Sequence, residues 1–292
     1  MNKRIIYTFL LFLFLSSSVS FAQKKQKNRH EVNFSLGTGV SSLIRDSELG
    51  TSSFKWSNNL GINYTFFFSS KLGIGTGAEI ALYKTQISGN NFETQYLIST
   101  PPELKGNFYL NTLFDNYTES LTTTFINIPL LITFQAPVLY ENLFYVTAGV
   151  KACVPFLTKY ETTYKSVKTM GYSDYTQQIY EEIPNHGFDT YKDIKTSGEL
   201  DLNLSFIATA ETGMKWILSD KWNLYTGLWF DYGLNDIRNN NKKIETIVYN
   251  ENNPSKYSYN SLFSSQQNGE YLIEKASLTS FGFRIRLAFG NN

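Results

Sequence analysis

Apolar and polar residues alternate along eight segments of the chain, and in each segment the large apolar side chains occupy one parity. Alternation with a period of two predicts a β-strand whose two faces meet different surroundings. The segments differ in length but share this pattern. We therefore expect strands at residues 32–40, 60–68, 72–82, 126–134, 144–154, 202–216, 222–234 and 280–289.

The charged residues within these segments indicate what the two surroundings are. All of them lie on the parity opposite to the apolar one, where they comprise four acids and four bases. The wet face of a soluble sheet would carry many more charges, whereas a narrow barrel interior accepts a few that pair with one another. We expect an interior charge network of Glu79, Lys151, Asp201, Glu211, Lys215, Asp231, Arg284 and Arg286.

These patterns predict an all-β fold, an eight-stranded antiparallel transmembrane β-barrel. Lipid would contact the apolar parity, because an Arg or Lys that faces mid-bilayer costs roughly 2 to 4 kcal/mol. Outer-membrane barrels have short periplasmic turns and long external loops, so we expect external loops near residues 85–119, 155–198 and 235–270. Residues 108–114 and 242–249 could add strands, which leaves a ten-stranded barrel as the alternative.

The first residues have the three parts of a secretory signal peptide. Lys3 and Arg4 form the basic region, Ile5 to Leu15 the apolar region, and Ser20-Phe21-Ala22 the cleavage site. The apolar run is shorter than the ~20 residues that a spanning helix needs. We expect a signal peptide at residues 1–22, a linker at 23–30 and the barrel at 31–289. The export signal and the barrel together predict the outer membrane of a Gram-negative bacterium.

The composition agrees with a membrane barrel and argues against nucleic acid as a partner. Aromatic residues make up 16% of the chain and charged residues only 17%, as in barrels whose aromatic girdles mark the membrane interfaces. Removing Lys3 and Arg4 lowers the basic residues from 26 to 24, against 25 acidic ones. The mature chain is near neutral and has no basic excess that would favour nucleic acid. We expect a monomeric barrel in contact with membrane lipid.

Residues that carry catalysis or bind metals are sparse. The histidines are His30 and His186 and the cysteine is Cys153, at spacings that support neither a nucleophile with its base nor a metal cluster. The glycines of Gly73-x-Gly75-x-Gly77 resemble a phosphate loop but lie within a strand that no helix follows. Crowding inside a small barrel explains them better. We therefore expect no enzyme activity, no cofactor and no metal.

Tyrosines are frequent in one expected external loop. Their rings could form a recognition surface, because tyrosine offers contact area with little conformational entropy to lose. Alternatively, they pack on one another or belong to hairpins that extend above the membrane. The candidate recognition residues are Tyr160, Tyr164, Tyr172, Tyr175, Tyr180 and Tyr191.

Three stretches resemble a known family: "FINIPLLITF" (Phe125 to Phe134), "LGIGTGAEIALY" (Leu72 to Tyr83) and "LWFDYGLNDI" (Leu228 to Ile237). They are similar to the porin-family outer-membrane β-barrels of Bacteroidetes that include the PorT-like proteins. The resemblance implies a structural, assembly or secretion-associated role, with envelope or secretion proteins as partners. The alternative is an adhesin-like barrel that binds a protein or glycan through its tyrosine-rich loops. A solute pore is disfavoured, because eight strands leave room only for side chains.

Overall fold

The computed structural model describes residues 29–47, 49–99, 106–139, 142–239, 244–250, 253–267 and 269–290. The expected signal peptide at residues 1–22 lies outside the described residues, as does most of the expected linker. Within the described ranges, no helix is long and apolar enough to cross a membrane.

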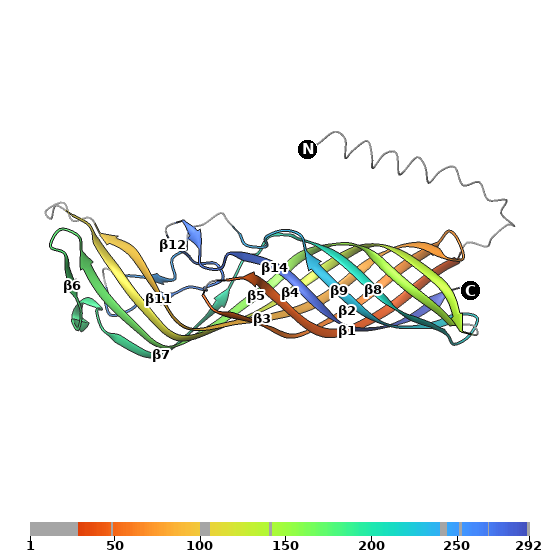
Figure 1. Ribbon diagram of the computed structural model, residues 1–292, viewed down its shortest axis with the longest axis horizontal. Coiled ribbons are helices and arrows are strands. Elements are labelled where there is room, and N and C mark those ends of the chain that lie inside the picture. Colours follow the sequence, from red (N-terminus) through yellow and green to blue (C-terminus); the bar gives the residue numbers. More distant parts are fainter. Residues whose placement is uncertain are drawn as a thin grey trace, which may run out of the picture.

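Eight antiparallel strands close into a barrel, in the order β4-β3-β2-β1-β14-β9-β8-β5, and β5 pairs back to β4. Closure joins the first and last strands, with Val32 paired to Phe289. Figure 1 shows the crossed strands as a cylinder on the right, and the predicted eight-stranded fold is confirmed. The strands of the ring are β1 (Arg29–Asp46), β2 (Thr51–Phe67), β3 (Leu72–Ser99), β4 (Phe108–Leu139), β5 (Asn142–Ser173), β8 (Ser205–Ile217), β9 (Trp222–Gly233) and β14 (Lys275–Gly290).

The ten-stranded alternative is wrong. Residues 108–114 form the first part of β4 rather than a strand of their own. The described part of 242–249 contains β10 (Ile247–Val248), which pairs with β11 (Ser258–Tyr259) instead of a barrel strand. Two short strands pair with β5 beyond the ring, on either side of the 3-10 turn η2 (Pro184–His186): these are β6 (Gln178–Tyr180) and β7 (Thr190–Glu199).

The ring turns its apolar parity outward. Phe34, Ile132 and Leu228, on three different strands, keep 59%, 61% and 63% of their surface exposed. The alternate residues, such as Ser35 and Asn127, are buried inside. Soluble monomers rarely expose an apolar surface that encircles the molecule. In a bilayer such a surface contacts the lipid chains, and the closed ladder pairs the backbone groups that lipid cannot hydrogen-bond. We call this exterior the apolar belt.

Three barrel strands continue past the apolar belt, and we call this part of the sheet, together with β7, the extension. The distal parts of β3, β4 and β5 stay paired there, and β7 pairs with Lys159–Lys168 of β5. The expected loops near 85–119 and 155–198 are therefore mostly strand. The sequence of these strands lacks a clear alternation of apolar and polar residues, because threonine, serine and asparagine occur on both of their faces. The opposite end, where residues 68–71 and 218–221 connect strands, is called the turn end.

The extension bends along one line that crosses all four of its strands. At this level one residue of each strand is left out of the ladder, and pairing resumes on both sides of it. Asn116 and Asp193 adopt positive φ angles of 47° and 54° there, a conformation that asparagine and aspartate tolerate better than most residues. The bend is visible at the left of Figure 1, and the four residues on its line are Asn90, Asn116, Lys165 and Asp193.

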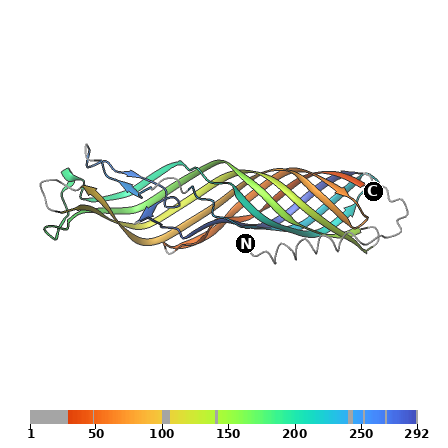
Figure 2. The ribbon, with the colours of Figure 1, turned by 90° about the horizontal axis from the view of Figure 1, so that it is seen from above.

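The third long connection covers the inner face of the extension. We call its described residues between Ile244 and Glu274 the cap; besides β10 and β11 it contains β12 (Gln266–Gln267) and β13 (Glu270–Tyr271). Ile247 and Leu262 of the cap are fully buried against Phe114 and Val167 of the sheet. In Figure 2 the cap lies along the extension. The protein therefore has an ordinary apolar core above a barrel that is apolar outside.

The apolar belt generates a stability prediction. Leu130 projects outward in the middle of the belt segment of β4, and Thr118 projects outward on the same strand within the extension. We expect Leu130→Arg to lower the free energy of unfolding by roughly 2 to 4 kcal/mol in lipid vesicles, because the guanidinium would face hydrocarbon. The control Thr118→Arg should change it by less than about 0.5 kcal/mol. Equal losses in the two variants, measured by denaturant titration, would contradict a lipid-facing belt.

Candidate functional site: an ion network in the barrel and a capped extension

A network of buried ions fills the middle of the barrel. The Lys151 ammonium lies 3.3 Å from the Glu79 carboxylate and 3.0 Å from that of Asp231. Arg284 reaches Glu79 at 3.4 Å and Glu211 at 3.1 Å. These side chains come from five strands, so the network links β3, β5, β8, β9 and β14 across the lumen. Every one of them is almost completely buried.

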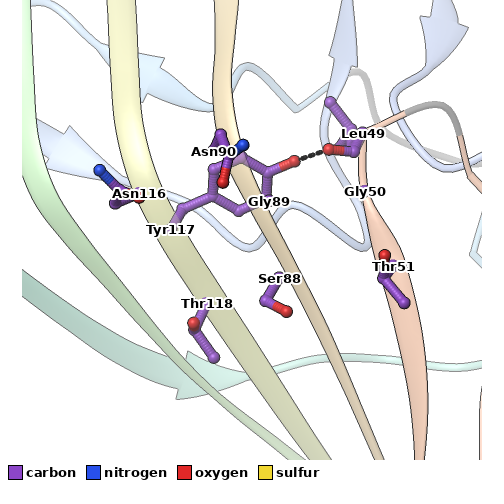
Figure 3. A pocket seen from close by; sticks show the side chains of 9 residues that line it. All are labelled: Leu49, Gly50, Thr51, Ser88, Gly89, Asn90, Asn116, Tyr117 and Thr118. Carbon is purple, nitrogen blue, oxygen red and sulfur yellow. Dashed lines mark hydrogen bonds between the residues drawn. The ribbon is translucent and has the colours of Figure 1, made fainter.

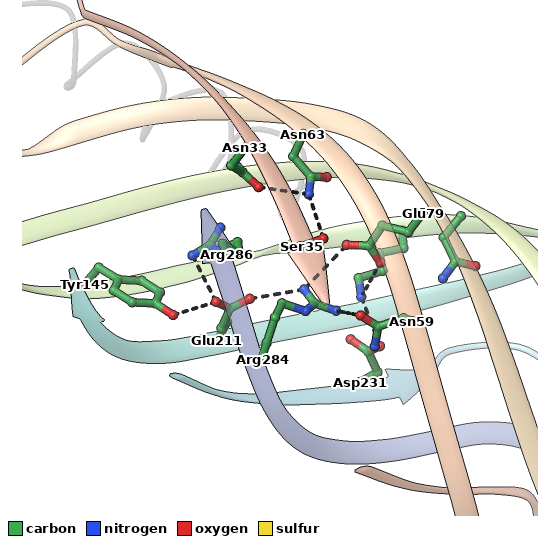
Figure 4. A network of polar contacts seen from close by, with 12 residues as sticks. Asn33, Ser35, Asn59, Asn63, Glu79, Tyr145, Glu211, Asp231, Arg284 and Arg286 are labelled. Carbon is green, nitrogen blue, oxygen red and sulfur yellow. Dashed lines mark hydrogen bonds and ion pairs between the residues drawn. The ribbon is translucent and has the colours of Figure 1, made fainter. Parts of the chain in front are cut away.

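The network continues toward the turn end through Glu211. Arg286 lies 2.9 Å from the Glu211 carboxylate, which also accepts a 2.6 Å hydrogen bond from the Tyr145 hydroxyl. Arg284 donates to the side-chain oxygen of Asn59 at 3.2 Å. Figure 4 shows Glu211 between the two arginines, with Glu79 on the far side of Arg284. Acids and bases therefore alternate along the chain of contacts, which offsets the cost of burying each charge.

A second ionic cluster lies nearer the turn end and centres on Glu31. Its carboxylate pairs with Lys215 and accepts hydrogen bonds from the Tyr225 hydroxyl at 2.5 Å and the Asn223 amide at 3.3 Å. The Lys215 ammonium also lies 5.2 Å from the centre of the Tyr225 ring. All four side chains are buried. This cluster ties β1 to β8 and β9 across the lumen.

The structure places seven of the eight expected network residues inside the barrel. Asp201 is the correction: it is exposed, because β8 begins only at Ser205 and the preceding residues run outside the ring. Glu31 takes its place in the charge balance, so the four acids still face four bases. Its parity, shared with Asn33 and Ser35, is the sequence signal that would have found it.

The candidate catalytic and metal-binding residues are scattered. His30 is exposed at the turn end, where its ring nitrogen lies 2.6 Å from the Tyr64 hydroxyl, and His186 lies in η2 beyond the opposite end. Cys153 is a buried free thiol inside the barrel wall. Among the described residues, no group of three or more His, Cys, Asp or Glu side chains could hold a metal ion. At Gly77, a Cβ atom would lie 2.3 Å from the Ile62 carbonyl oxygen, so backbone crowding requires the glycine.

The extension contains a buried carboxylate that the sequence did not reveal. Glu119 lies on β4 beyond the apolar belt and accepts four hydrogen bonds, from the Ser261 hydroxyl at 2.7 Å, the Thr162 hydroxyl at 2.6 Å, and the amides of Leu262 and Phe263 at 2.7 and 3.0 Å. No described lysine or arginine pairs with it. Burial raises the pKa of Glu119 above its ordinary 4.5, although its four donors oppose the shift. Glu119 thus connects the cap to the sheet through its hydrogen bonds to residues 261–263.

Most of the candidate recognition tyrosines are buried or partly buried rather than exposed to solvent. Tyr164 is buried against Phe114, with ring centres 4.9 Å apart, and Tyr191 donates to the Gly187 carbonyl at 3.1 Å. Only Tyr175 among the six is largely exposed, at 58%. The partly buried members of the set are Tyr160, Tyr172, Tyr180 and Tyr191. The alternative in which these tyrosines pack within extended hairpins describes five of the six positions.

A family model described as "Outer membrane protein beta-barrel domain" matches residues 21–239. The chain belongs to this family. Membership agrees with the apolar belt and assigns this outer-membrane barrel to the Gram-negative envelope. No curated protein matches its sequence.

Solved structures that resemble this outer-membrane barrel are also barrels. Neisserial surface protein A aligns over 90% of this chain and 99% of its own, with 8% identity and a TM-score of 0.37. OprG from Pseudomonas aeruginosa aligns over 91% and 96%, with 10% identity and a TM-score of 0.37. Ail, the attachment invasion locus protein of Yersinia pestis, aligns over 91% and 99%, with 7% identity and a TM-score of 0.27. These likenesses concern the fold alone.

The cluster around Glu31 predicts a non-additive pair of substitutions. Lys215→Met leaves the Glu31 carboxylate buried without its cation, so we expect the free energy of unfolding to fall by about 3 to 5 kcal/mol. Adding Glu31→Gln removes the stranded charge and should recover at least half of that loss. Denaturant titration in vesicles of the two single variants and the double variant measures the coupling. Additive losses would show that the two residues do not stabilise each other.

The contacts of Glu119 predict how docking of the cap depends on pH. Because burial raises the pKa of Glu119, the docked state holds its proton more tightly than the released state. The stability from this contact is complete below about pH 4.5 and declines as pH rises through the raised pKa. Glu119→Gln cannot ionise, so its docking should lack this dependence.

Hydrogen exchange of residues 261–265 tests the prediction for Glu119. The ratio of exchange rates in the native protein and in Glu119→Gln cancels the intrinsic effect of pH on exchange. We expect this ratio to rise between pH 4.5 and 8, because only the native carboxyl becomes charged. A ratio that stays constant over this range would contradict the role of Glu119.

Proposed function

We propose that this protein is a non-enzymatic outer-membrane barrel that recognises a macromolecule at its extended end. The observation that carries the proposal is the extension itself. Three barrel strands continue as a paired sheet, and the cap braces the inner face of that sheet through a buried core and the Glu119 contacts. A rigid scaffold that projects from a membrane anchor is suited to presenting a binding surface.

The barrel interior supports anchoring rather than transport. The ion network crosses the lumen from strand to strand, and the aromatic rings of Tyr83, Tyr145 and Trp229 are buried beside it. Eight strands enclose a space that side chains alone can fill. Opening a path for solutes would require separating several buried ion pairs, each of which loses its compensation when its partner moves. A solute pore is therefore the weakest of the candidate functions.

The extended end is proposed to face the outside of the cell. Outer-membrane barrels place short turns in the periplasm, and the described connections at the turn end, residues 68–71 and 218–221, have four residues each. In this orientation the extension and the cap would project from the cell surface. The single largely exposed tyrosine of the candidate set, Tyr175, would lie near its tip.

A structural or secretion-associated role in the envelope is the second candidate. It rests on the sequence resemblance to PorT-like barrels of Bacteroidetes, which implies partners on the periplasmic side. We rank it second because the described connections at the turn end are short, whereas the extension and the cap pack around a core of their own. Periplasmic partners that bind equally well without the extension would support this second role.

Orientation can be tested with single cysteines. The native thiol of Cys153 is buried, so a membrane-impermeant maleimide should leave it unmodified. We expect Tyr175→Cys to be labelled on intact cells, because Tyr175 is exposed on the extension. Asp220→Cys, at the exposed turn between β8 and β9, should be labelled only after the outer membrane is permeabilised. The reverse pattern would overturn the proposed surface role, as would stable single-channel currents from the purified protein in planar bilayers.

A further inference from the structure

The two edges of the extension are unequal. Its strands lie in the order β3-β4-β5-β7, so β3 and β7 form the edges. β2 pairs with β3 only as far as Thr51 opposite Ser88, whereas β3 continues to Ser99. Among the described residues, no strand pairs with this side of β3 between Gly89 and Ser99. A strand edge of this length leaves about half of its backbone groups available to another chain.

The β7 edge carries the features by which proteins protect an edge from other strands. Lys192, Asp193, Lys195 and Glu199 are all exposed along its ten residues. Asp193 also has a positive φ and interrupts the ladder. Charges of this kind discourage strand addition. The β7 edge is therefore unfavourable for the addition of another strand.

The β3 edge carries less protection. Between Gly89 and Ser99 it has one charged residue, Glu93, and no proline, and its ladder to β4 is regular from Asn91 to Leu97, between the omitted Asn90 and an irregularity before Ser99. Its outward-facing residues are exposed, whereas Thr94 and Tyr96 on the other face are buried beneath the cap. The Tyr96 hydroxyl accepts a hydrogen bond from the Thr246 amide at 3.0 Å and donates to the Gln266 carbonyl at 3.1 Å, which holds this part of β3 extended. A rigid edge with few charges and unpaired backbone groups is the usual template for an added strand.

A cavity of about 530 Å³ lies where the β3 edge becomes free. It is lined by Leu49 and Gly50, which precede β2, and by Thr51 at the start of β2. Ser88 to Asn90 of β3 and Asn116 to Thr118 of β4 complete the lining. Figure 3 shows the Tyr117 ring passing over Gly89 so that its hydroxyl donates to the Leu49 carbonyl. A Cβ atom at Gly89 would lie 2.2 Å from that hydroxyl, so glycine is required for the contact. The residues that precede β2 therefore lie against Ser88 and Gly89, and the Leu49 side chain packs on the core beneath the cap, so this part of the chain does not pair with β3 beyond Ser88.

We propose that an extended segment of a partner protein adds to the β3 edge between Gly89 and Ser99, in line with β2, with one end in the cavity at Leu49–Thr51. This inference rests on the proposed recognition function and specifies its ligand as a polypeptide strand bound mainly through backbone hydrogen bonds. The exposed face of the edge carries Glu93 as its one charge, so a neutral or basic segment fits it. Alternate side chains of that segment would contact the cap and the solvent.

A synthetic peptide of residues 108–117 with capped ends, in which Asn replaces Asp115 so that the peptide is neutral, is a suitable probe. In the protein these residues pair with β3 from the other side, with Phe114 opposite Phe92 and Leu110 opposite Tyr96. An antiparallel peptide on the free edge can present the same cross-strand partners. We expect it to bind the native protein in nanodiscs. N-methylation of one alternate set of its amides should weaken binding at least tenfold, whereas methylation of the other set should change it less than twofold, because only one set faces β3.

Two protein variants locate the bound peptide. Gln95→Pro introduces proline into the β3 edge, and Lys195→Pro is the matched change on the β7 edge. The first should weaken peptide binding at least tenfold and the second less than twofold. Where Gln95→Pro fails to fold, as judged by heat-modified gel mobility, cross-linking locates the peptide on the native protein. A peptide with benzoylphenylalanine in place of Phe114 should cross-link to residues 91–97 of β3, and cross-links confined to β7 would contradict the proposal.

Several outcomes would overturn the inference. One is a native protein that fails to bind the peptide, and another is binding that is insensitive to both methylation patterns or is lost equally in Lys195→Pro. A dimer of the purified protein that dissociates in Gln95→Pro would assign the edge to a second copy of this chain instead of a partner strand. The cysteine labelling is independent of all these results. If Tyr175→Cys proves external while the peptide fails, surface recognition stands and only strand addition is excluded.

Discussion

The structure depends on the closure of the backbone ladder between β1 and β14. Lipid offers no hydrogen-bond partners, so every strand in the apolar belt needs a neighbour on both sides. The pairing of Val32 with Phe289 supplies the last of these neighbours by joining the first and last strands of the barrel. Once the ring is closed, side-chain parity has a fixed meaning: one set faces lipid and the other faces a lumen too narrow for water to fill.

The narrow lumen explains the ion network. The small residues and glycines on the inner parity leave room for a few long charged side chains, and each must meet its counter-ion because water cannot solvate it. Glu79 and Glu211 each contact two cations, and Arg284 bridges them. The contacts join strands that are not neighbours in the ring, so the network ties opposite sides of the barrel together.

The extension follows different rules because water surrounds it. Its core is apolar inside, with Phe114 and Val167 beneath the cap, and the buried carboxylate of Glu119 is solvated by hydroxyls and backbone amides instead of cations. The hairpin of β1 and β2 ends well before the hairpin of β3 and β4. This difference in length creates the free edge of β3. The edge that we propose for recognition thus arises from unequal hairpins above a barrel with regular pairing.

The sequence by itself determined the barrel: period-two alternation with all charges on one parity is produced by lipid on one side and a crowded lumen on the other. The same parity would have placed Glu31 inside, but Asp201 was assigned wrongly because alternation continues past the true start of β8. Only the tertiary structure decided that residues 85–119 and 155–198 are mostly strand, since both of their faces carry threonine and other small polar residues. It also decided which tyrosines are buried. The contacts of Glu119 with residues 261–263 depended on the tertiary structure too, because they join segments more than 140 residues apart. The alternation of apolar and polar residues along a strand indicates what surrounds each of its faces. Contacts between distant segments depend instead on the register and length of every strand between them.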